Sequence, residues 1–239
     1  MCNSISCSFG RWCDRADALL GVSGIHITSV AEAATGLIVH VETDQTMSGC
    51  PACGVVAVGH GRRRIRLRDI PCFGRPVQLR WAKRLCRCPD EHCPKKVFSE
   101  EHPLAGRRAI LTARAIRWAT DALEKYDTSV SALAHQLGVS WQALWTGIEA
   151  EARRRIGRPE RLAGIDALGV DEHVWTHTGL PGAGMVTGII DHTRDEHGNV
   201  RARLLDLVPG RSGRMRRLWC GLVGRAPRGL SYLGEKRTF

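Results

Sequence analysis

The chain has 239 residues, 43% hydrophobic and 25% charged, which is ordinary for a folded protein of one large domain or several small modules. It has no apolar run near the roughly 20 residues that cross a bilayer, and Met1 to Leu20 lack the apolar segment of a secretory signal, so we expect a cytoplasmic protein without a membrane partner. The formal net charge of +11 favours a polyanionic partner. Seven basic residues and one acidic residue beyond Ser212 supply more than half of this charge, so it is only moderate support.

The N-terminal part of the chain is expected to be rich in β-structure. Residues 24–42 alternate apolar and polar side chains, which predicts a β-hairpin within an N-terminal segment of residues 1–45. Strands are also expected at 62–68, which is strongly basic, and around 77–81. Both strands belong to a cysteine-rich region that we assign as a zinc-binding domain of residues 46–100.

The periodicity becomes helical in residues 105–155, where apolar side chains recur at intervals of three and four in three successive segments. The second and third segments follow Ser129 and Ser140, are separated by Gly138, and predict a helix-turn-helix. The second helix of such a motif enters the major groove of DNA, and a glutamine at its start suits adenine. Candidate DNA contacts are the exposed positions at its start and the basic strand: Ser140, Trp141, Gln142, Thr146, Arg62, Arg63 and Arg64.

The remaining third of the chain returns to β-structure. Residues 156–164 form a linker marked by charge, glycine and proline. Strands are predicted at 167–172, 185–191 and 201–208, and the turn residues between them indicate an antiparallel meander. In residues 213–239 neither the helical nor the strand period holds.

Ten cysteines in a chain without an export signal favour metal ligation, because a reducing compartment keeps thiols free. Cys50 and Cys53 form one close pair, and Cys88 and Cys93 form a second beyond a β-rich connector. Four thiolates in this arrangement suit a structural Zn²⁺ ion. Cys86 is an alternative partner for Cys88, but we prefer Cys93, because two cysteines separated by one residue face the same way only in extended backbone.

Leu168 to His173 has the pattern of an apolar strand that ends in two acids, Asp171 and Glu172. A carboxylate held on a rigid strand is suited to a two-metal phosphoryl-transfer site, because Mg²⁺ prefers fixed oxygen ligands. Strands commonly end in solvated acids, so the pattern alone leaves both interpretations open.

Taken in order, these features resemble the ISL3 family of insertion-sequence transposases. The resemblance implies a DDE-type enzyme with an α+β fold of several modules: a zinc-binding domain, a helix-turn-helix and an RNase H-like catalytic core. It also favours Cys88 and Cys93 as the second pair, since the family has the same four-residue gap. The motifs that carry the likeness are Cys50 to Cys53, Arg84 to Cys88, Cys93 to Glu100, Leu168 to Trp175, Thr187 to Thr193 and Leu204 to Ser212.

The resemblance also implies roles for particular residues and partners. Asp171 corresponds to the first of three catalytic acids, which hold two divalent ions such as Mg²⁺. Asp191 and Asp206 lie on the following strands and do not match the second and third acids, which belong to later elements. The implied partner is DNA at the terminal inverted repeats of the element, with a second copy of the chain or a full-length transposase as a further partner.

The family pattern stops just after Ser212, where the periodicity and the charge balance also change. We therefore expect residues 165–212 to be the first three strands of an incomplete RNase H-like core. Residues 213–239 are expected to be an aberrant basic tail, as a shifted reading frame would produce; a sequencing error or a short functional product would look the same.

The function expected from these features is that of a transposase-derived DNA-binding protein that does not cleave DNA. One alternative is a standalone regulator that competes with full-length transposase at the element ends. Another is a zinc-stapled protein-interaction module, which would have no salt-dependent affinity for DNA.

Overall fold

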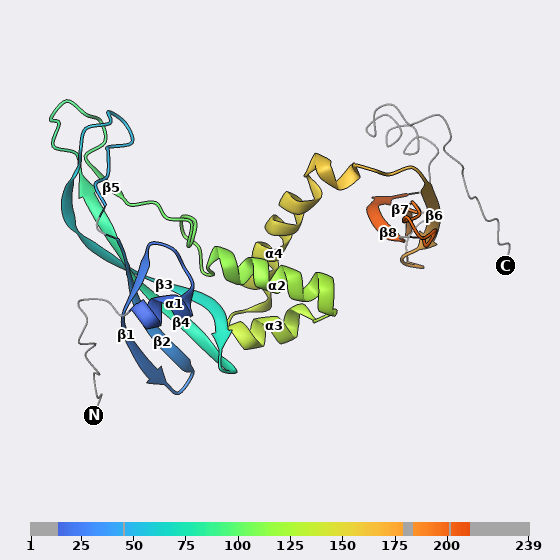
Figure 1. Ribbon diagram of the computed structural model, residues 1–239, viewed down its shortest axis with the longest axis horizontal. Helices are drawn as coiled ribbons and strands as arrows, with labels where there is room; N and C mark the ends of the chain where they lie inside the picture. Colours follow the sequence, from blue (N-terminus) through green and yellow to red (C-terminus); the bar gives the residue numbers. More distant parts are fainter. Residues whose placement is uncertain (1–13, 45, 179–183, 201, 211–239) are drawn as a thin grey trace. The chain divides into compact units, whose positions relative to one another are not determined.

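The computed structural model describes residues 14–44, 46–178, 184–200 and 202–210, so the predicted basic tail lies outside the described residues. The chain divides into two compact units at Arg155 and Ile156, and each is described by itself (Figure 1). Among the described helices, none has both the length and the apolar character that crossing a bilayer requires.

The first unit is built on a five-stranded sheet. β1 (Ile25–Ala33) and β2 (Gly36–Thr43) form the predicted antiparallel hairpin, and β3 (Val58–Cys72) and β4 (Arg75–Arg87) form a longer one. β2 runs parallel to β4, which gives the order β1-β2-β4-β3, and the short β5 (Val97–Ser99) pairs with the end of β4. The N-terminal hairpin and the two basic strands therefore share one sheet.

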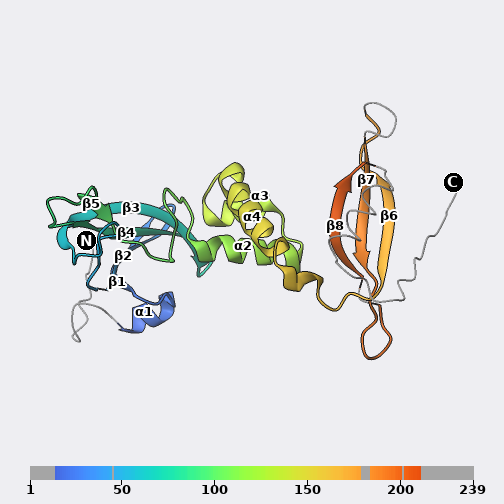
Figure 2. The same cartoon turned by 90° about the horizontal axis from the view of Figure 1, so that it is seen from above.

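One face of this sheet forms an apolar core. Leu79 and Trp81 of β4 are fully buried there, and Leu104 covers them from the chain that follows β5. Helix α1 (Asp14–Leu20) lies on one side of the sheet, and its last residue packs against the same core (Figure 2). The turn between β1 and β2 requires Gly36, because a Cβ there would lie 2.1 Å from the carbonyl oxygen of Pro76.

Three helices follow the sheet, as the periodicity predicts: α2 (Ala113–Tyr126), α3 (Val130–Leu137) and α4 (Trp141–Ile156). Each begins after a hydroxyl residue whose oxygen accepts a hydrogen bond from the backbone N–H three positions later. The distances are 3.1 Å for Thr112, 3.2 Å for Ser129 and 3.2 Å for Ser140. These caps satisfy N–H groups that have no partner within the helix.

The apolar sides of the three helices meet in a core of their own. Ala115 and Ala119 of α2 pack with Leu133 of α3 and with Leu144 and Ile148 of α4, all of them buried. The small alanine side chains allow the helices to approach closely. The identity of α3 and α4 as a DNA-binding helix-turn-helix stays a prediction.

An ion pair between a buried carboxylate and a half-buried guanidinium joins the helices to the sheet. Asp69 on β3 is 1% exposed and accepts a hydrogen bond of 2.6 Å from the hydroxyl of Thr112, the residue that caps α2. The guanidinium of Arg114 pairs with the same carboxylate, with Nε 2.8 Å from Oδ1. Backbone bonds of Arg68 with Ile110 (2.7 Å) and with Thr112 (2.9 Å) continue the junction.

The second unit is a three-stranded antiparallel meander, as predicted. It begins after a short 3₁₀ turn, Pro159–Leu162, and consists of β6 (Leu168–Val174), β7 (Met185–Asp191) and β8 (Arg203–Pro209) in that order. Its buried apolar residues are Ile165, Leu168, Ile189, Leu205 and Val208. That this sheet begins an RNase H-like core stays a prediction.

The junction at Asp69 predicts that replacing this acid destabilises the protein far more than replacing an exposed acid. Asp69→Ala is expected to lower the free energy of unfolding by about 3–5 kcal/mol, because it leaves the Arg114 charge without its partner. The control is Glu32→Ala, which removes a carboxylate that is 77% exposed and 3.0 Å from Arg75, and should cost less than about 1 kcal/mol. Urea denaturation followed by circular dichroism measures both, and similar losses would contradict the role of Asp69.

Candidate metal centre

Four cysteines from two loops meet in one group, which we call the cysteine cluster: Cys50, Cys53, Cys88 and Cys93. Their four sulfur atoms lie within 4.8 Å of one another, and all but that of Cys53 belong to buried residues. Cys50 and Cys53 come from the loop between β2 and β3, whereas Cys88 follows β4 and Cys93 precedes β5. Within the part of the chain that the structure describes, no other set of three or more ligand-type side chains brings its ligand atoms together in this way.

The distances between the sulfur atoms fit a tetrahedral metal site. Zn–S bonds of about 2.3 Å in tetrahedral geometry place the sulfurs about 3.8 Å apart. The Sγ atoms of Cys50 and Cys93 are 3.7 Å apart, and those of Cys53 and Cys88 are 3.5 Å apart. The cluster therefore fits Zn²⁺, and four protein ligands leave no position for substrate, which is the arrangement of a structural site.

Tight turns hold the cysteines in place. In the first loop, the N–H of Cys50 donates to the carbonyl of Val55 and the N–H of Gly54 donates to the carbonyl of Cys50, both at 2.8 Å. In the second loop, the N–H of Lys95 lies 3.4 Å from the sulfur of Cys93 and donates to it. These turns direct the thiols of each loop toward one point.

The environment of the thiols separates their pKa values. A backbone hydrogen bond from Ala52 lowers the pKa of Cys50 to about 7, whereas burial raises the pKa of Cys88 to about 12. Although the N–H of Lys95 favours the thiolate of Cys93, burial raises the pKa of that thiol above its usual value. Zinc binds thiolates, so binding at neutral pH must release protons.

Cys86 lies outside the cysteine cluster, although it is buried. It sits on β4 opposite Phe98 of β5, two residues before Cys88. Cys72, at the end of β3, is half-buried and packs against the apolar core of the sheet. The two therefore serve packing rather than the cluster.

A buried carboxylate braces the strands next to the cluster; it ends the Cys93 to Glu100 motif, to which the sequence analysis assigned no bracing role. Glu100 is 6% exposed and accepts hydrogen bonds from the hydroxyl of Thr43 (2.6 Å) and from the backbone N–H (2.6 Å) and Nε (2.8 Å) of Arg84. Burial opposes its ionisation, but these donors hold the pKa of Glu100 below its usual range. Arg84 also donates to the carbonyl of Thr46 at 2.9 Å, which ties down the chain that enters the first cysteine loop.

The candidate DNA contacts of the helical region lie together. Ser140, Trp141, Gln142 and Thr146 are all exposed at the start of α4, where Ser140 is the capping residue. Trp145, which is not among the residues chosen from the sequence, stacks on Trp141 with ring centroids 5.5 Å apart. The signal for it is the spacing of four residues between two tryptophans on one helix.

The three candidate arginines of β3 differ in their surroundings. Arg62 forms an ion pair with Glu42 at 3.1 Å and also donates to the carbonyl of Ala82. Arg64 is exposed on the same face of the strand. Because side chains alternate along a strand, Arg63 lies on the opposite face.

The acids of the second unit do not converge. Asp171 is exposed on β6 and pairs with Gly188 of β7. Asp206 of β8 pairs with the next residue of β7, Ile189, so its side chain lies on the opposite face of the sheet from that of Asp171. Asp191 is 5% exposed and forms an ion pair of 3.0 Å with Arg203, which is a structural role.

Comparison with known proteins identifies the region around the cluster. Residues 48–93 match the family model described as the zinc-finger of transposase IS204/IS1001/IS1096/IS1165. The match contains all four cysteines of the cluster, so an ISL3-type zinc ribbon is confirmed for these residues, and the four cysteines fit a structural Zn²⁺ ion. Neither the curated proteins nor the solved structures gave a match to the chain.

The cluster predicts which cysteines carry zinc. Cys53→Ser is expected to weaken zinc binding by more than the roughly 10–100-fold that loss of an outer-shell partner causes, because it removes a ligand itself. Cys72→Ser is the control and should leave zinc content and affinity unchanged. Metal analysis of the purified variants and competition with a chromophoric chelator measure this, and equal zinc content in the two variants would contradict the assignment.

The pKa values predict how zinc affinity depends on pH. Protons compete with zinc for the thiolates, so apparent affinity falls as pH falls. Below pH 7 the Cys50 thiol, whose pKa is about 7, also releases a proton on binding. The slope of log affinity against pH should therefore steepen by about one as pH falls through 7. Competition titrations between pH 6 and about pH 8 test it, and a constant slope across that range would show that the pKa of Cys50 lies outside it.

Proposed function

We propose that this chain is a transposase-derived DNA-binding protein that recognises the terminal inverted repeats of an insertion sequence. The observation that carries the proposal is the ISL3-type zinc ribbon at residues 48–93, whose four cysteines meet in one cluster. In the proposal the ribbon has no catalytic role, and its metal ion fixes the outer ends of β3 and β4 so that the side chains of these strands keep fixed positions.

The connection between α3 and α4 supports base recognition by α4. α3 ends at Gly138, whose φ of +65° is left-handed, and Ser140 caps α4 after a connection of three residues. A short connection that contains glycine is typical of a helix-turn-helix, whose second helix presents its first turns to the major groove, and it supports this proposal. Gln142 offers both a donor and an acceptor, which match the N7 and N6 edge of adenine.

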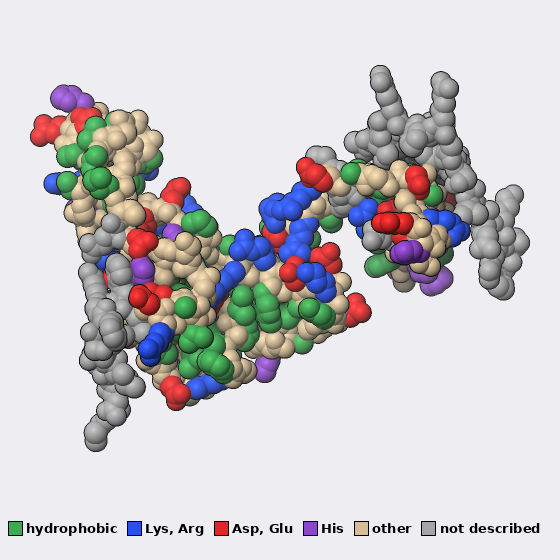
Figure 3. Space-filling model, in the orientation of Figure 1, with side chains coloured by type: hydrophobic (Ala, Val, Ile, Leu, Met, Phe, Trp, Pro, Cys, Tyr) green, Lys and Arg blue, Asp and Glu red, His purple; other side chains and the backbone are tan. Residues whose placement is uncertain are grey.

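The basic residues of α4 itself are largely neutralised by neighbouring acids. Figure 3 shows Lys and Arg side chains gathered along this helix, and its last turn carries Arg153, Arg154 and Arg155. Arg153 pairs with Glu149 at 2.7 Å, and Arg154 and Arg155 both pair with Glu151, whose pKa the Arg154 guanidinium lowers to about 2. In the proposal this turn stabilises the helix, and the charge that attracts DNA comes from elsewhere in the unit.

In the proposal the chain binds DNA without cutting it. Residues 165–210 supply Asp171 as one of the three acids that the family resemblance implies, and one acid does not hold two metal ions. Incubation of the 239-residue chain with Mg²⁺ and an element-end duplex should give no strand cleavage. Cleavage that Asp171→Asn abolishes would overturn this part of the proposal.

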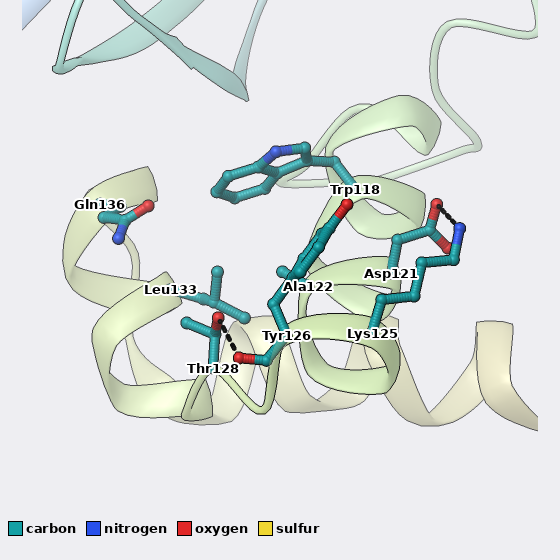
Figure 4. A pocket seen from close by; sticks show the side chains of 8 residues that line it. All are labelled: Trp118, Asp121, Ala122, Lys125, Tyr126, Thr128, Leu133 and Gln136. Atoms are coloured by element: carbon teal, nitrogen blue, oxygen red, sulfur yellow. Dashed lines mark hydrogen bonds and ion pairs between the residues drawn. The ribbon is translucent and has the colours of Figure 1, made fainter.

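Base recognition by α4 predicts a loss of sequence discrimination in one glutamine variant. Gln142→Ala is expected to reduce the preference for an element-end duplex over a scrambled duplex by about 1–3 kcal/mol. The matched control is Gln136→Ala on α3, which removes an exposed glutamine from the groove that α2 and α3 form around Trp118 and Tyr126 (Figure 4).

Fluorescence anisotropy with both duplexes at several salt concentrations provides the measurement. If both glutamine variants lose the preference for the element-end duplex equally, α4 does not recognise bases through Gln142. Absence of salt-dependent affinity of the unmodified chain for either duplex would overturn the proposed function and favour a protein-interaction module.

A further inference from the structure

The face of the sheet opposite the apolar core carries a set of neighbouring arginines. Strand register places Arg66 of β3 directly opposite Arg80 of β4, and Arg64 lies two residues from Arg66 on the same side. These positions alternate with Leu79 and Trp81, so their side chains leave the sheet on the side away from the core. We call Arg64, Arg66 and Arg80 the arginine face.

The charge of the arginine face is not neutralised within the described chain. The neighbouring pair Arg62 and Arg84 is bound to acids, Glu42 and Glu100. In the part of the chain that the structure describes, no carboxylate forms an ion pair with Arg64, Arg66 or Arg80. Arg80 instead donates from Nε to the amide oxygen of Gln78, a neutral acceptor, at 3.3 Å.

The sheet retains these like charges at an energetic cost. Arg66 and Arg80 are direct cross-strand partners, and like charges in that position destabilise a sheet. On the next strand His40 lies opposite Arg80. Burial, with the charges of Arg80 and Arg64, lowers the pKa of His40 and so favours its neutral form. A bound polyanion would relieve the repulsion on this face.

The arginine face lies beside the start of the proposed recognition helix. Arg68 follows on the same side of β3, and its guanidinium carbon is 3.5 Å from the position that a Cβ on Gly138 would take. Gly138 opens the turn from α3 into α4. Four residues of strand, from Arg64 to Arg68, span about 13 Å, well within the roughly 34 Å of one helical turn of DNA. One duplex is long enough to reach both surfaces.

From this arrangement we infer that the arginine face binds the phosphate backbone of duplex DNA next to the bases that α4 reads. Guanidinium groups match phosphate oxygens in shape and charge. Phe98 of β5 lies on this side of the sheet but packs against the cysteine cluster. The described strand positions next to Arg64, Arg66 and Arg80 hold no tryptophan, tyrosine or phenylalanine on which unpaired bases would stack, which favours a duplex over a single strand. The inference rests on the proposed function, and it assigns non-specific affinity to the sheet and sequence preference to α4.

The test uses the full chain loaded with zinc and a triple variant, Arg64→Gln, Arg66→Gln and Arg80→Gln. Each phosphate contact contributes about 0.9 to the slope of log affinity against log salt concentration, so the triple variant should lose about 2.7 from that slope. The loss should be the same for the element-end and the scrambled duplex. A matched triple variant, Arg15→Gln, Arg75→Gln and Arg117→Gln, removes the same charge from positions outside the arginine face and should lose less than about one from the slope.

Two further controls separate loss of contacts from loss of structure. The corresponding triple lysine variant keeps the charge and should retain most of the slope. The triple glutamine variant removes the repulsion between cross-strand partners, so its zinc content should equal that of the unmodified chain and its thermal midpoint should be no lower. If the triple glutamine variant holds less zinc and the triple lysine variant also loses the salt dependence of binding, these residues serve the fold. That result would overturn the inference.

The outcomes distinguish this inference from the function on which it rests. If the triple glutamine variant keeps the full slope while Gln142→Ala still loses discrimination, the arginine face is not a DNA contact and the proposed function stands. If the unmodified chain binds neither duplex, both the inference and the proposed function are wrong. If the triple variant loses affinity for poly-glutamate but none for the duplexes, the face serves an acidic protein instead.

Discussion

The first unit depends on one buried carboxylate, that of Asp69. It accepts a hydrogen bond from Thr112, which in turn caps α2, and it pairs with Arg114, whose guanidinium also donates to the carbonyl of Leu20 at the end of α1. Burying the Asp69 charge is costly, and the hydrogen-bond donors around the carboxylate offset that cost. Here both carboxylate oxygens have donors, so the interaction orients α1, the sheet and the helices toward one another. The position of the α3–α4 turn beside β3 follows from that orientation.

The opposite end of the β3–β4 hairpin is stabilised in a different way. The first seven residues of β3, Val58 to Arg64, are all exposed, so this part of the strand has no apolar core beneath it. Two strands without such a core are marginal in water. The cysteine cluster closes this end with a site that fits Zn²⁺, and Glu100 with Arg84 braces it against β2. A metal site thus replaces hydrophobic burial where the hairpin extends beyond the core.

The distribution of charge matters more for the proposed function than its total. The most basic run of α4 is paired with acids of the same helix and of α2, and Arg62 and Arg84 are paired as well. On the arginine face, by contrast, Arg64, Arg66 and Arg80 have no carboxylate partner among the described residues. Attraction to phosphate depends on such unneutralised groups, because an arginine already paired must first give up its partner. The sheet is therefore the better candidate for backbone contacts and α4 for base contacts.

Local patterns in the sequence predicted α2, α3 and α4, the caps Ser129 and Ser140 and most of the strands, because periodicity and caps depend on residues a few positions apart. They did not predict α1 or the cap Thr112. The spacing of Cys50 and Cys53 likewise indicated a metal-binding turn. Only the tertiary structure decided the parallel pairing of β2 with β4, the contact of Asp69 with Arg114 across 45 positions, and the cross-strand pair Arg66 and Arg80. These depend on strand register and on which faces pack together. A shift of one residue reverses the face of every side chain, and no local pattern fixes that choice for residues so far apart in the chain.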